Sequence, residues 1–259
     1  MKERIQKILA SAGVASRRNI EEMVRQGRIA VNGKIVWQLP VLVDPVADRI
    51  EVDGERIKLS ADSDTQRMYF LLNKPKNVHC TNVAQGEQIR AIDLLPRNIP
   101  GRVYPVARLD AASQGLLLLT NDGELTNQLT HPRFGVPKTY RAVVDGFVDA
   151  KTLQALSEGV WLSDPHSGKG FKTGKSRISV VKRSRDLTIL VITLREGRNH
   201  PVRRMLARAG HKVRELTRIR MGALSLGKLE PGQFRKLSSQ EVARLKLSFE
   251  RAQSGRGLP

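Results

Sequence analysis

The chain has 259 residues, of which 40% are hydrophobic, and its 45 Lys plus Arg against 25 Asp plus Glu give a formal net charge of +20. A chain of this length forms one or two domains, and so large an excess of positive charge is more than solubility requires. Because neutralising phosphates with Lys and Arg releases counterions, the charge favours a nucleic-acid-binding protein over one whose basic surface is merely solvated.

Residues 3–26 carry two short helical patterns. In the first, Ile5, Ile8 and Leu9 lie on one face, and Gly13 can end the helix. Ser16 can cap the start of the second helix. The residues on its buried side are Ile20, Met23 and Val24. The residues left to face solvent or the phosphates of a nucleic acid are Arg17, Arg18 and Arg25.

Two dipeptides predict β-hairpins after these helices. Gly27 ends the second helix, and Asn32-Gly33 and Asp53-Gly54 each stand between short β-like runs. Such pairs suit a type I′ turn, which needs positive φ at both central residues. The sequence therefore predicts a small α/β module over residues 1–60, followed by a polar linker at 61–66.

From residue 67 to 248 the pattern indicates a second, larger domain. We expect strands at 69–75, 139–144, 177–181 and 187–194, and helices at 123–130, 150–158 and 202–209. Because strands and helices do not alternate strictly, the fold class is α+β with a mainly antiparallel sheet. We expect a flexible loop at 163–176 and a disordered tail at 249–259.

Asp110 lies in a loop beside Arg108, just before a run of four leucines at 116–119 that predicts a buried strand. A carboxylate in a loop on a rigid scaffold suits a nucleophile or a general base. On these features alone, however, a surface Asp in a turn or an Arg–Asp ion pair is the favoured interpretation, because loops are rich in Asp.

Residues 194–220 form a second informative segment. Pro201 suits the first turn of a helix, Gly197 permits close approach of the backbone, and helix starts and arginines both favour phosphate. The cationic stretch runs on through Arg218 to Arg220, and we predict that it contacts RNA or DNA. The RNA-binding residues predicted within its first part are Arg198, Arg204 and Arg208.

Together these segments resemble the bacterial ribosomal RNA pseudouridine synthases of the RsuA/RluB group. Residues 4–36 are similar to the S4 RNA-binding module of that family, including Ser16-Arg17-Arg18 and Val31-Asn32-Gly33. Its three further motifs are matched by Arg108-Leu109-Asp110 with Ser113-Gln114-Gly115-Leu116, by Lys138-Thr139-Tyr140, and by residues 197–205. The resemblance covers residues 3–240, implies the pseudouridine synthase fold and reverses the interpretation of Asp110 as a surface residue.

The resemblance implies a role for each matched residue. Asp110 is the catalytic aspartate, Tyr140 packs against the target base, and Arg203 pairs with the Asp110 carboxylate. Arg108 lies near the flipped nucleotide. Leu194 lines the base pocket, although a leucine of a core strand is an equally good interpretation. From the residues alone, Tyr140 is a half-buried strand aromatic.

The expected activity is isomerisation of a uridine in ribosomal RNA by a cytoplasmic monomer that needs no cofactor. Residues 115–118, 122–125 and His131-Pro132 look closer to the large-subunit branch, whose substrate is 23S rRNA, than to the small-subunit branch, which modifies 16S rRNA. A non-catalytic ribosome-assembly factor is the alternative from another class. Cys80 is the single cysteine and the five histidines lack metal-site spacing, so we expect no metal site. No apolar run approaches the about 20 residues of a membrane span, and no signal peptide is expected.

Overall fold

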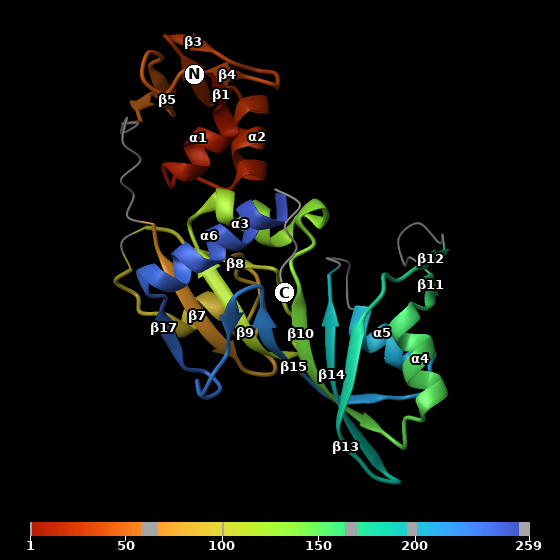
Figure 1. Cartoon of the computed structure of the whole chain (residues 1–259). Helices are drawn as coiled ribbons and strands as arrows, with labels where there is room; N and C mark the ends of the chain where they lie inside the picture. Colours follow the sequence, from red (N-terminus) through yellow and green to blue (C-terminus); the bar gives the residue numbers. More distant parts are fainter. Residues whose placement is uncertain (1, 58–66, 100, 164–169, 196–200, 254–259) are drawn as a thin grey trace. The chain divides into compact units, whose positions relative to one another are not determined.

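The computed structural model describes residues 2–57, 67–99, 101–163, 170–195 and 201–253 (Figure 1). The chain divides into two compact units, Met1–Arg67 with Asn98–Arg102 and Met68–Arg97 with Val103–Pro259. The division after Arg67 falls beside the position at which the composition changes. The predicted linker at 61–66 lies outside the described residues. Across the described ranges, no helix combines the length and the apolar character needed to cross a membrane.

The first unit packs two helices against short antiparallel strands. Its elements are β1 (Glu3–Arg4), α1 (Ile5–Ser11), α2 (Arg17–Arg25), β2 (Ile29–Val31), β3 (Lys34–Ile35), β4 (Leu42–Val43), β5 (Ile50–Val52) and β6 (Glu55–Arg56). β1 pairs with β4, and the other strands form a sheet in the order β3-β2-β5-β6. The core of this unit is formed by Ile5, Ile8, Leu9, Ile20, Met23, Val24, Ile29, Val43, Ile50 and Val52.

The local signals predicted for this unit are confirmed. Ser16 accepts a hydrogen bond from the Asn19 backbone N–H at 3.2 Å, as the cap of α2 should. The turn residues all have positive φ: Asn32 52°, Gly33 78°, Asp53 52° and Gly54 81°. These values match the type I′ turn that Asn-Gly and Asp-Gly favour.

The second unit is built around one mixed sheet. Its strands are β7 (Tyr69–Lys74), β8 (Tyr104–Val106), β9 (Gln114–Thr120), β10 (Lys138–Asp145), β11 (Trp161–Ser163), β12 (Gly170–Lys172), β13 (Arg177–Arg183), β14 (Leu187–Leu194), β15 (Val213–Met221), β16 (Leu224–Ser225) and β17 (Phe234–Lys236). Its helices are η1 (Ala91–Leu94), α3 (Gly123–Thr130), η2 (Pro132–Phe134), α4 (Ala150–Glu158), α5 (Pro201–Arg208) and α6 (Ser239–Gln253). The strands and helices predicted from the sequence are all present, with bounds that differ by at most two residues.

The main sheet has the strand order β13-β14-β10-β15-β9-β7-β17, with β8 beside β9 and β16 beside β15. Among the described strands of this sheet, β15 and β9 pair in parallel and the other neighbours pair antiparallel. The predicted α+β class with a mainly antiparallel sheet is therefore confirmed. The parallel pairing is short, joining Thr217 to Gln114 and Arg218 to Gly115.

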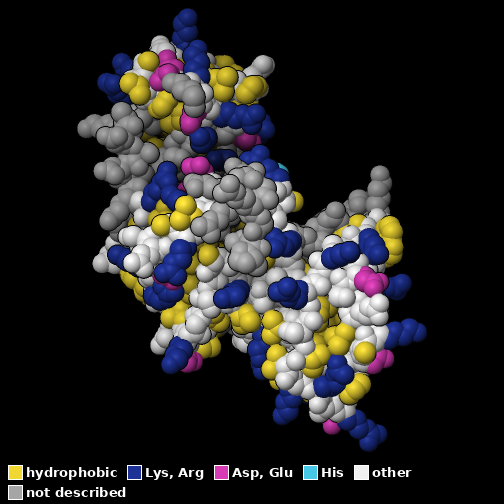
Figure 2. All heavy atoms as spheres, viewed as in Figure 1, with side chains coloured by type: hydrophobic (Ala, Val, Ile, Leu, Met, Phe, Trp, Pro, Cys, Tyr) yellow, Lys and Arg dark blue, Asp and Glu magenta, His cyan; other side chains and the backbone are white. Residues whose placement is uncertain are grey.

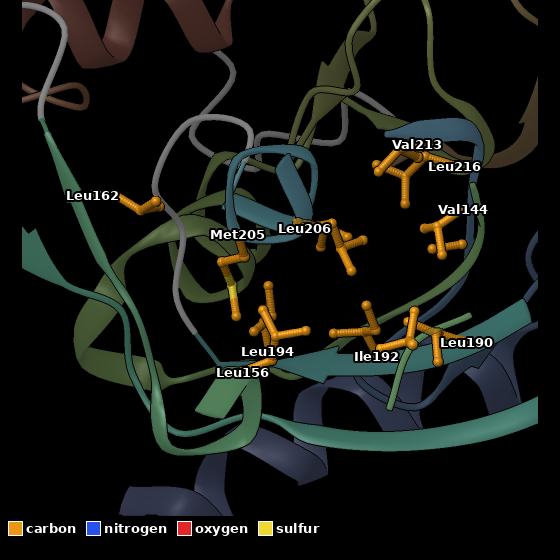
Figure 3. Packing of buried hydrophobic residues seen from close by; sticks show 13 residues of the cluster. Val144, Leu156, Leu162, Leu190, Ile192, Leu194, Met205, Leu206, Val213 and Leu216 are labelled. Carbon is orange, nitrogen blue, oxygen red and sulfur yellow. The ribbon is translucent and has the colours of Figure 1, made fainter. Parts of the chain in front are cut away.

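Two separate cores lie on either side of this parallel junction. One packs α5 and α4 against β10, β14 and β15, and Figure 3 shows Leu156 and Leu194 close to Met205 of α5. The other packs α3 and α6 against β9 and β7, through Leu116, Leu118 and Leu245 among others. Burying each of these side chains contributes roughly 1.5–3 kcal/mol relative to exposure. The junction between β9 and β15 is thus held between two packed halves.

Three expectations about irregular or C-terminal segments need correction. Residues 163–176 are not simply a loop, because Gly170–Lys172 forms β12 and pairs with β11 through Leu162 and Phe171. The Gly, Lys and Ser residues of this segment favoured a loop in the prediction, and the two strands, each three residues long, are too short to give a clear pattern. The predicted tail at 249–259 starts too early, because α6 continues to Gln253. This helix was not predicted from the sequence, although Leu245 anchors it in the second core.

Candidate functional site

Asp110 lies in the turn between β8 and β9, directly before the junction of the two halves of the sheet. Its backbone carbonyl accepts a hydrogen bond from the Ser113 N–H at 3.1 Å, which closes the turn. The residue is half-buried, and Leu109 before it is buried. The carboxylate therefore stands on a short turn between two strands of the core.

The segment after β7 fixes the main chain on both sides of Asp110. The Asn77 N–H donates to the Ala111 carbonyl at 2.8 Å, and the Leu109 N–H donates to the Cys80 sulfur at 3.4 Å. Burial raises the pKa of the Cys80 thiol. With both neighbours of Asp110 bonded, the turn has little freedom to displace the carboxylate.

Lys74, at the end of β7, makes a third contact with this turn, through a hydrogen bond to a main-chain carbonyl. Its side chain is fully buried, and its ammonium donates to the carbonyls of Pro75 and Val78, both at 2.8 Å, and of Ala111 at 3.4 Å. Burial lowers the pKa of Lys74, while the nearby Cys80 and Asp110 act in the opposite direction. Lys74 thus places a buried positive charge near the carboxylate.

Arg218 of β15 holds the two ends of the Asp110 turn. Its side chain is 1% exposed, its Nε donates to the Leu116 carbonyl at 2.8 Å, and its Nη1 donates to the Ala107 carbonyl at 2.7 Å. Ala107 has φ of 50°, a conformation that costs an alanine energy and needs support from its surroundings. Gly115 permits the close approach, because a Cβ there would lie 2.4 Å from the Arg218 carbonyl oxygen.

The prediction that the cationic stretch as far as Arg220 contacts RNA is wrong for Arg218. The side chain lies on the same face of β15 as Leu216, and that face is buried. The two-residue spacing from Leu216 to Arg218 along β15 could have indicated this. The charge of Arg218, however, suggested exposure. The sequence did not indicate a role in the site for either Lys74 or Arg218.

Arg203 of α5 reaches the turn, but it does not form the predicted ion pair with Asp110. Its Nη2 donates to the Ala112 carbonyl at 3.0 Å and its Nη1 to the Val213 carbonyl at 3.1 Å. Both acceptors are main-chain oxygens, one in the Asp110 turn and the other at the start of β15. Arg203 therefore joins α5 to the turn two residues after the carboxylate.

Tyr140 and Lys138 lie on the face of β10 that continues from the core under α5. Tyr140 is half-buried and stands opposite Arg218 of β15, and Lys138 is 7% exposed and stands opposite Leu194. Burial, helped by the charge of Arg218, lowers the pKa of Lys138 to about 8. Its ammonium forms no hydrogen bond or ion pair with any residue in the described ranges. Lys138 belongs to the motif Lys138-Thr139-Tyr140, but the sequence did not indicate a role for it in the site.

Leu194 belongs to the core rather than to an open surface. It is 1% exposed, and Figure 3 shows it among the side chains around Leu156 and Met205. This agrees with the alternative that it is a leucine of a core strand. Its contact with a base stays a prediction.

The predicted RNA-binding arginines have different surroundings. Arg198 lies outside the described residues. Arg204 donates to the Ser163 carbonyl and stacks over Phe171, so it supports the β11–β12 hairpin. Arg25 pairs with Glu22 on α2 at 3.1 Å. The ones that are exposed and form no ion pair with the described residues are Arg17, Arg18, Arg108 and Arg208.

Asp122, which follows β9, has a structural role. It is 3% exposed and accepts hydrogen bonds from the N–H groups of Glu124 and Leu125, as the cap of α3. The Tyr69 hydroxyl also donates to it at 2.8 Å. Asp122 is therefore committed to the start of α3 and to Tyr69. Within the described residues, no group of three or more His, Cys, Asp or Glu side chains could hold a metal ion.

Comparison with known proteins identifies the two units. Residues 68–208 match the family described as RNA pseudouridylate synthase, and residues 3–37 match the S4 domain. A chain of Aquifex aeolicus (strain VF5), named as an uncharacterized RNA pseudouridine synthase, is 44% identical over 95% of this chain and 94% of its own length. The ribosomal large subunit pseudouridine synthase B of Bacillus subtilis (strain 168) is 40% identical over 94% and 96%.

A solved structure agrees with these sequence relationships. A crystal structure of a pseudouridylate synthase has 28% identity and a TM-score of 0.66, and the match covers 93% of this chain and 99% of that one. The resemblance seen in the motifs is thereby confirmed. The chain belongs to the RNA pseudouridylate synthase family and carries an S4 domain at its N-terminal end.

Proposed function

We propose that this RNA pseudouridine synthase modifies a uridine of large-subunit ribosomal RNA and that Asp110 is its catalytic carboxylate. The observation that carries the proposal is the fixation of the Asp110 turn by hydrogen bonds from Asn77, Lys74, Arg203 and Arg218. Such support suits a group that must meet a reacting atom in one position. The name of the Bacillus subtilis relative supports the choice of ribosomal subunit.

The reaction is an isomerisation, and its atoms balance without a co-substrate. The bond from N1 of uracil to C1′ breaks, the uracil turns, C5 bonds to C1′, and C5 loses a proton while N1 gains one. Asp110 can serve by attacking C1′ or by removing a proton from the sugar. Either route uses the charged carboxylate as the reacting group.

Tyr140 and Lys138 are proposed to receive the nucleoside. A base must leave its helical stack to reach Asp110, at a cost of a few kcal/mol that stacking on an aromatic ring offsets. Tyr140 offers that ring. The Lys138 ammonium, which lacks a protein partner among the described residues, offers a donor to a phosphate or carbonyl oxygen of the nucleotide. Arg203 holds the Asp110 turn through its hydrogen bond to the Ala112 carbonyl.

Affinity for the RNA is proposed to come from the exposed cations of both units. Lys and Arg side chains predominate over Asp and Glu on the face shown in Figure 2. In the S4 unit, Arg17 and Arg18 form no ion pair with a described Asp or Glu, so their guanidinium groups are available to phosphate. Phosphate contacts position the RNA without reading its sequence.

Replacing Asp110 tests the catalytic assignment. Asp110→Asn should lower kcat by at least about 1,000-fold, because a single reacting group is lost, while Kd for the RNA stays within about twofold. Turnover is measured by pseudouridine formation in a 23S rRNA transcript under single-turnover conditions. Asp186→Asn, at an exposed aspartate on the β13–β14 connection, is the matched control. An Asp110→Asn enzyme with normal turnover would refute the assignment.

The substrate is tested by mapping pseudouridines in both ribosomal RNAs of cells with and without the protein. We expect one 23S rRNA position to lose its modification and to regain it when the wild-type chain, but not Asp110→Asn, is restored. Loss of a position in 16S rRNA would overturn the large-subunit proposal. No change in either RNA would overturn ribosomal RNA as the substrate.

A further inference from the structure

A pocket on the S4 unit is lined by polar and charged side chains, several of which have no hydrogen-bond or ion-pair partner among the described residues. Its volume is about 360 Å³, and its walls come from β1, α1, α2 and β4. The lining groups that matter here are Arg4, Arg17, Lys7, Gln6, Glu21 and Leu42. Every one of them belongs to the first unit, so the pocket does not depend on how the two units are placed.

Two guanidinium groups that line this pocket have no partner among the residues that the structure describes. Lys7 is neutralised by Glu3, with 2.8 Å between Nζ and Oε1. Arg4 and Arg17, by contrast, form no hydrogen bond or ion pair through their side chains with any residue between 2 and 57 or in the other described ranges. Two uncommitted guanidiniums on one pocket favour a phosphate group as ligand.

Gln6 adds a buried acceptor to the pocket. Its side chain is 9% exposed, and its Oε1 accepts no hydrogen bond from any described residue. Its Nε2 reaches Glu21 Oε1 only at 3.5 Å, the outer limit of a hydrogen bond, so the amide is loosely held and can turn. Buried side-chain oxygens nearly always find a donor, and an exception calls for a missing partner.

Leu42 gives the pocket an apolar wall. Its side chain is 55% exposed, although β4 places the next residue, Val43, in the core. An apolar wall, a pair of cations and an orphaned acceptor together match a nucleotide. The sugar packs on the leucine, the phosphate takes the guanidiniums, and the acceptor needs a donor close to the phosphate. In an RNA backbone that donor is the ribose 2′-hydroxyl.

We propose that this pocket binds one ribonucleotide of the substrate RNA, with its phosphate between Arg4 and Arg17 and its 2′-hydroxyl donating to Gln6 Oε1. The proposal rests on the proposed function only in taking RNA as the ligand, and it does not involve Asp110. The S4 unit then selects RNA over DNA through one side chain and holds either nucleic acid through others.

The test compares RNA and DNA binding by the full-length chain. The probes are fluorescein-labelled 12-mers of adenosine and of deoxyadenosine nucleotides, which contain no uridine and cannot turn over. Binding is followed by anisotropy at several salt concentrations. We expect the wild-type chain to prefer the RNA probe by about tenfold. Gln6→Met should weaken RNA binding about fivefold and leave DNA binding unchanged, whereas Gln38→Met, at an exposed glutamine of the same unit, should change neither.

The arginines should give a different signature. Arg4→Gln and Arg17→Gln should weaken binding of RNA and DNA equally, and each should reduce the slope of log K against log salt by about 0.7. Arg56→Gln, an exposed residue of β6 outside the pocket, is the control with the same charge change. An Arg4→Gln/Arg17→Gln protein that binds both probes like the wild type would overturn the phosphate site.

Gln6→Glu protects the test against a simple folding defect. It retains an acceptor of the same length, so the ratio of RNA to DNA affinity should persist while both affinities fall through charge repulsion. If Gln6→Met keeps the wild-type ratio, or if Gln6→Glu loses it although the protein unfolds at its usual temperature, the role of Gln6 is wrong. Asp110→Asn should keep the wild-type ratio of RNA to DNA affinity, which separates this proposal from the assignment of Asp110.

Discussion

The two units use positive charge in opposite ways. In the S4 unit the cations that matter, Arg17 and Arg18, are exposed and form no ion pair with the described residues. In the catalytic unit Lys74 and Arg218 are fully or almost fully buried and are bonded to main-chain carbonyls. The first arrangement leaves the charge for a ligand, whereas the second uses the charge to hold the protein.

Because of this difference, one set of cations acts on the affinity for RNA and the other on the position of the Asp110 turn. Exposed cations contribute to binding through counterion release, an effect that weakens with salt and tolerates substitution. Buried cations are costly to leave without partners, so their hydrogen bonds fix the surrounding backbone in one arrangement. We therefore expect substitutions in the S4 unit to act on Kd and substitutions around Asp110 to act on kcat.

Arg218→Met should give the larger effect. It removes the donors to Ala107 and Leu116 and should lower kcat about 100-fold, because a small misplacement of a catalytic group has a cost of that size. The free energy of unfolding should fall by about 2 kcal/mol, since two carbonyls lose their partner. Kd for the RNA should stay within about twofold.

The measurement is single-turnover pseudouridine formation at saturating transcript, well below the unfolding midpoint. Arg177→Met, at an exposed arginine of β13, should leave kcat unchanged. Arg218→Lys should recover part of the lost turnover, because one of the two hydrogen bonds can re-form. A fully active Arg218→Met enzyme would show that the turn does not need this support.

Deletion of residues 1–60 should have an intermediate effect, on binding alone. The S4 unit has its own core, formed by residues between Ile5 and Val52, so the catalytic unit should keep its unfolding midpoint. The Kd for rRNA should rise about tenfold at physiological salt, and the salt slope should fall because phosphate contacts are lost. Titration of both proteins with labelled transcript checks this, and a truncated protein with full affinity would contradict it.

The pH dependence of Lys138 should give the smallest effect. The Lys138 pKa is lowered to about 8, so its ammonium is charged below that pH and neutral above it. If the charged form contacts the nucleotide, kcat/KM should fall by about fivefold as pH rises from 7.5 to 9. In Lys138→Met this step should be absent, and in Lys138→Arg, which stays charged, activity should persist to higher pH.

The stability contribution of Lys138 has the opposite sign. Because its folded pKa lies below the ordinary lysine value of 10.5, the unfolded chain binds more protons between these two pH values. The wild type should therefore gain stability relative to Lys138→Met as pH rises from about 8 to 10.5. A parallel fall of activity and stability in that window would contradict the role proposed for this side chain.

Local sequence signals were sufficient for most elements of the fold. Asn32-Gly33 fixes a hairpin because few other residues accept positive φ, and Ser16 caps α2 through a bond to a residue three positions away. The motif containing Asp110 also placed the candidate carboxylate in a turn before a buried strand. These features depend on neighbours in the chain, so the sequence by itself determined them.

The support beneath Asp110 was decided only by the tertiary structure. Arg218 lies 108 positions farther along the chain than Asp110, and it reaches the turn because β15 pairs with β9 in parallel at Gly115. From the sequence alone, the charge of Arg218 predicted a position on the surface. A buried cation is stable only where carbonyls from distant segments converge on it, and no local pattern records that convergence. The same holds for Lys74, whose ammonium bonds the turn 37 residues away.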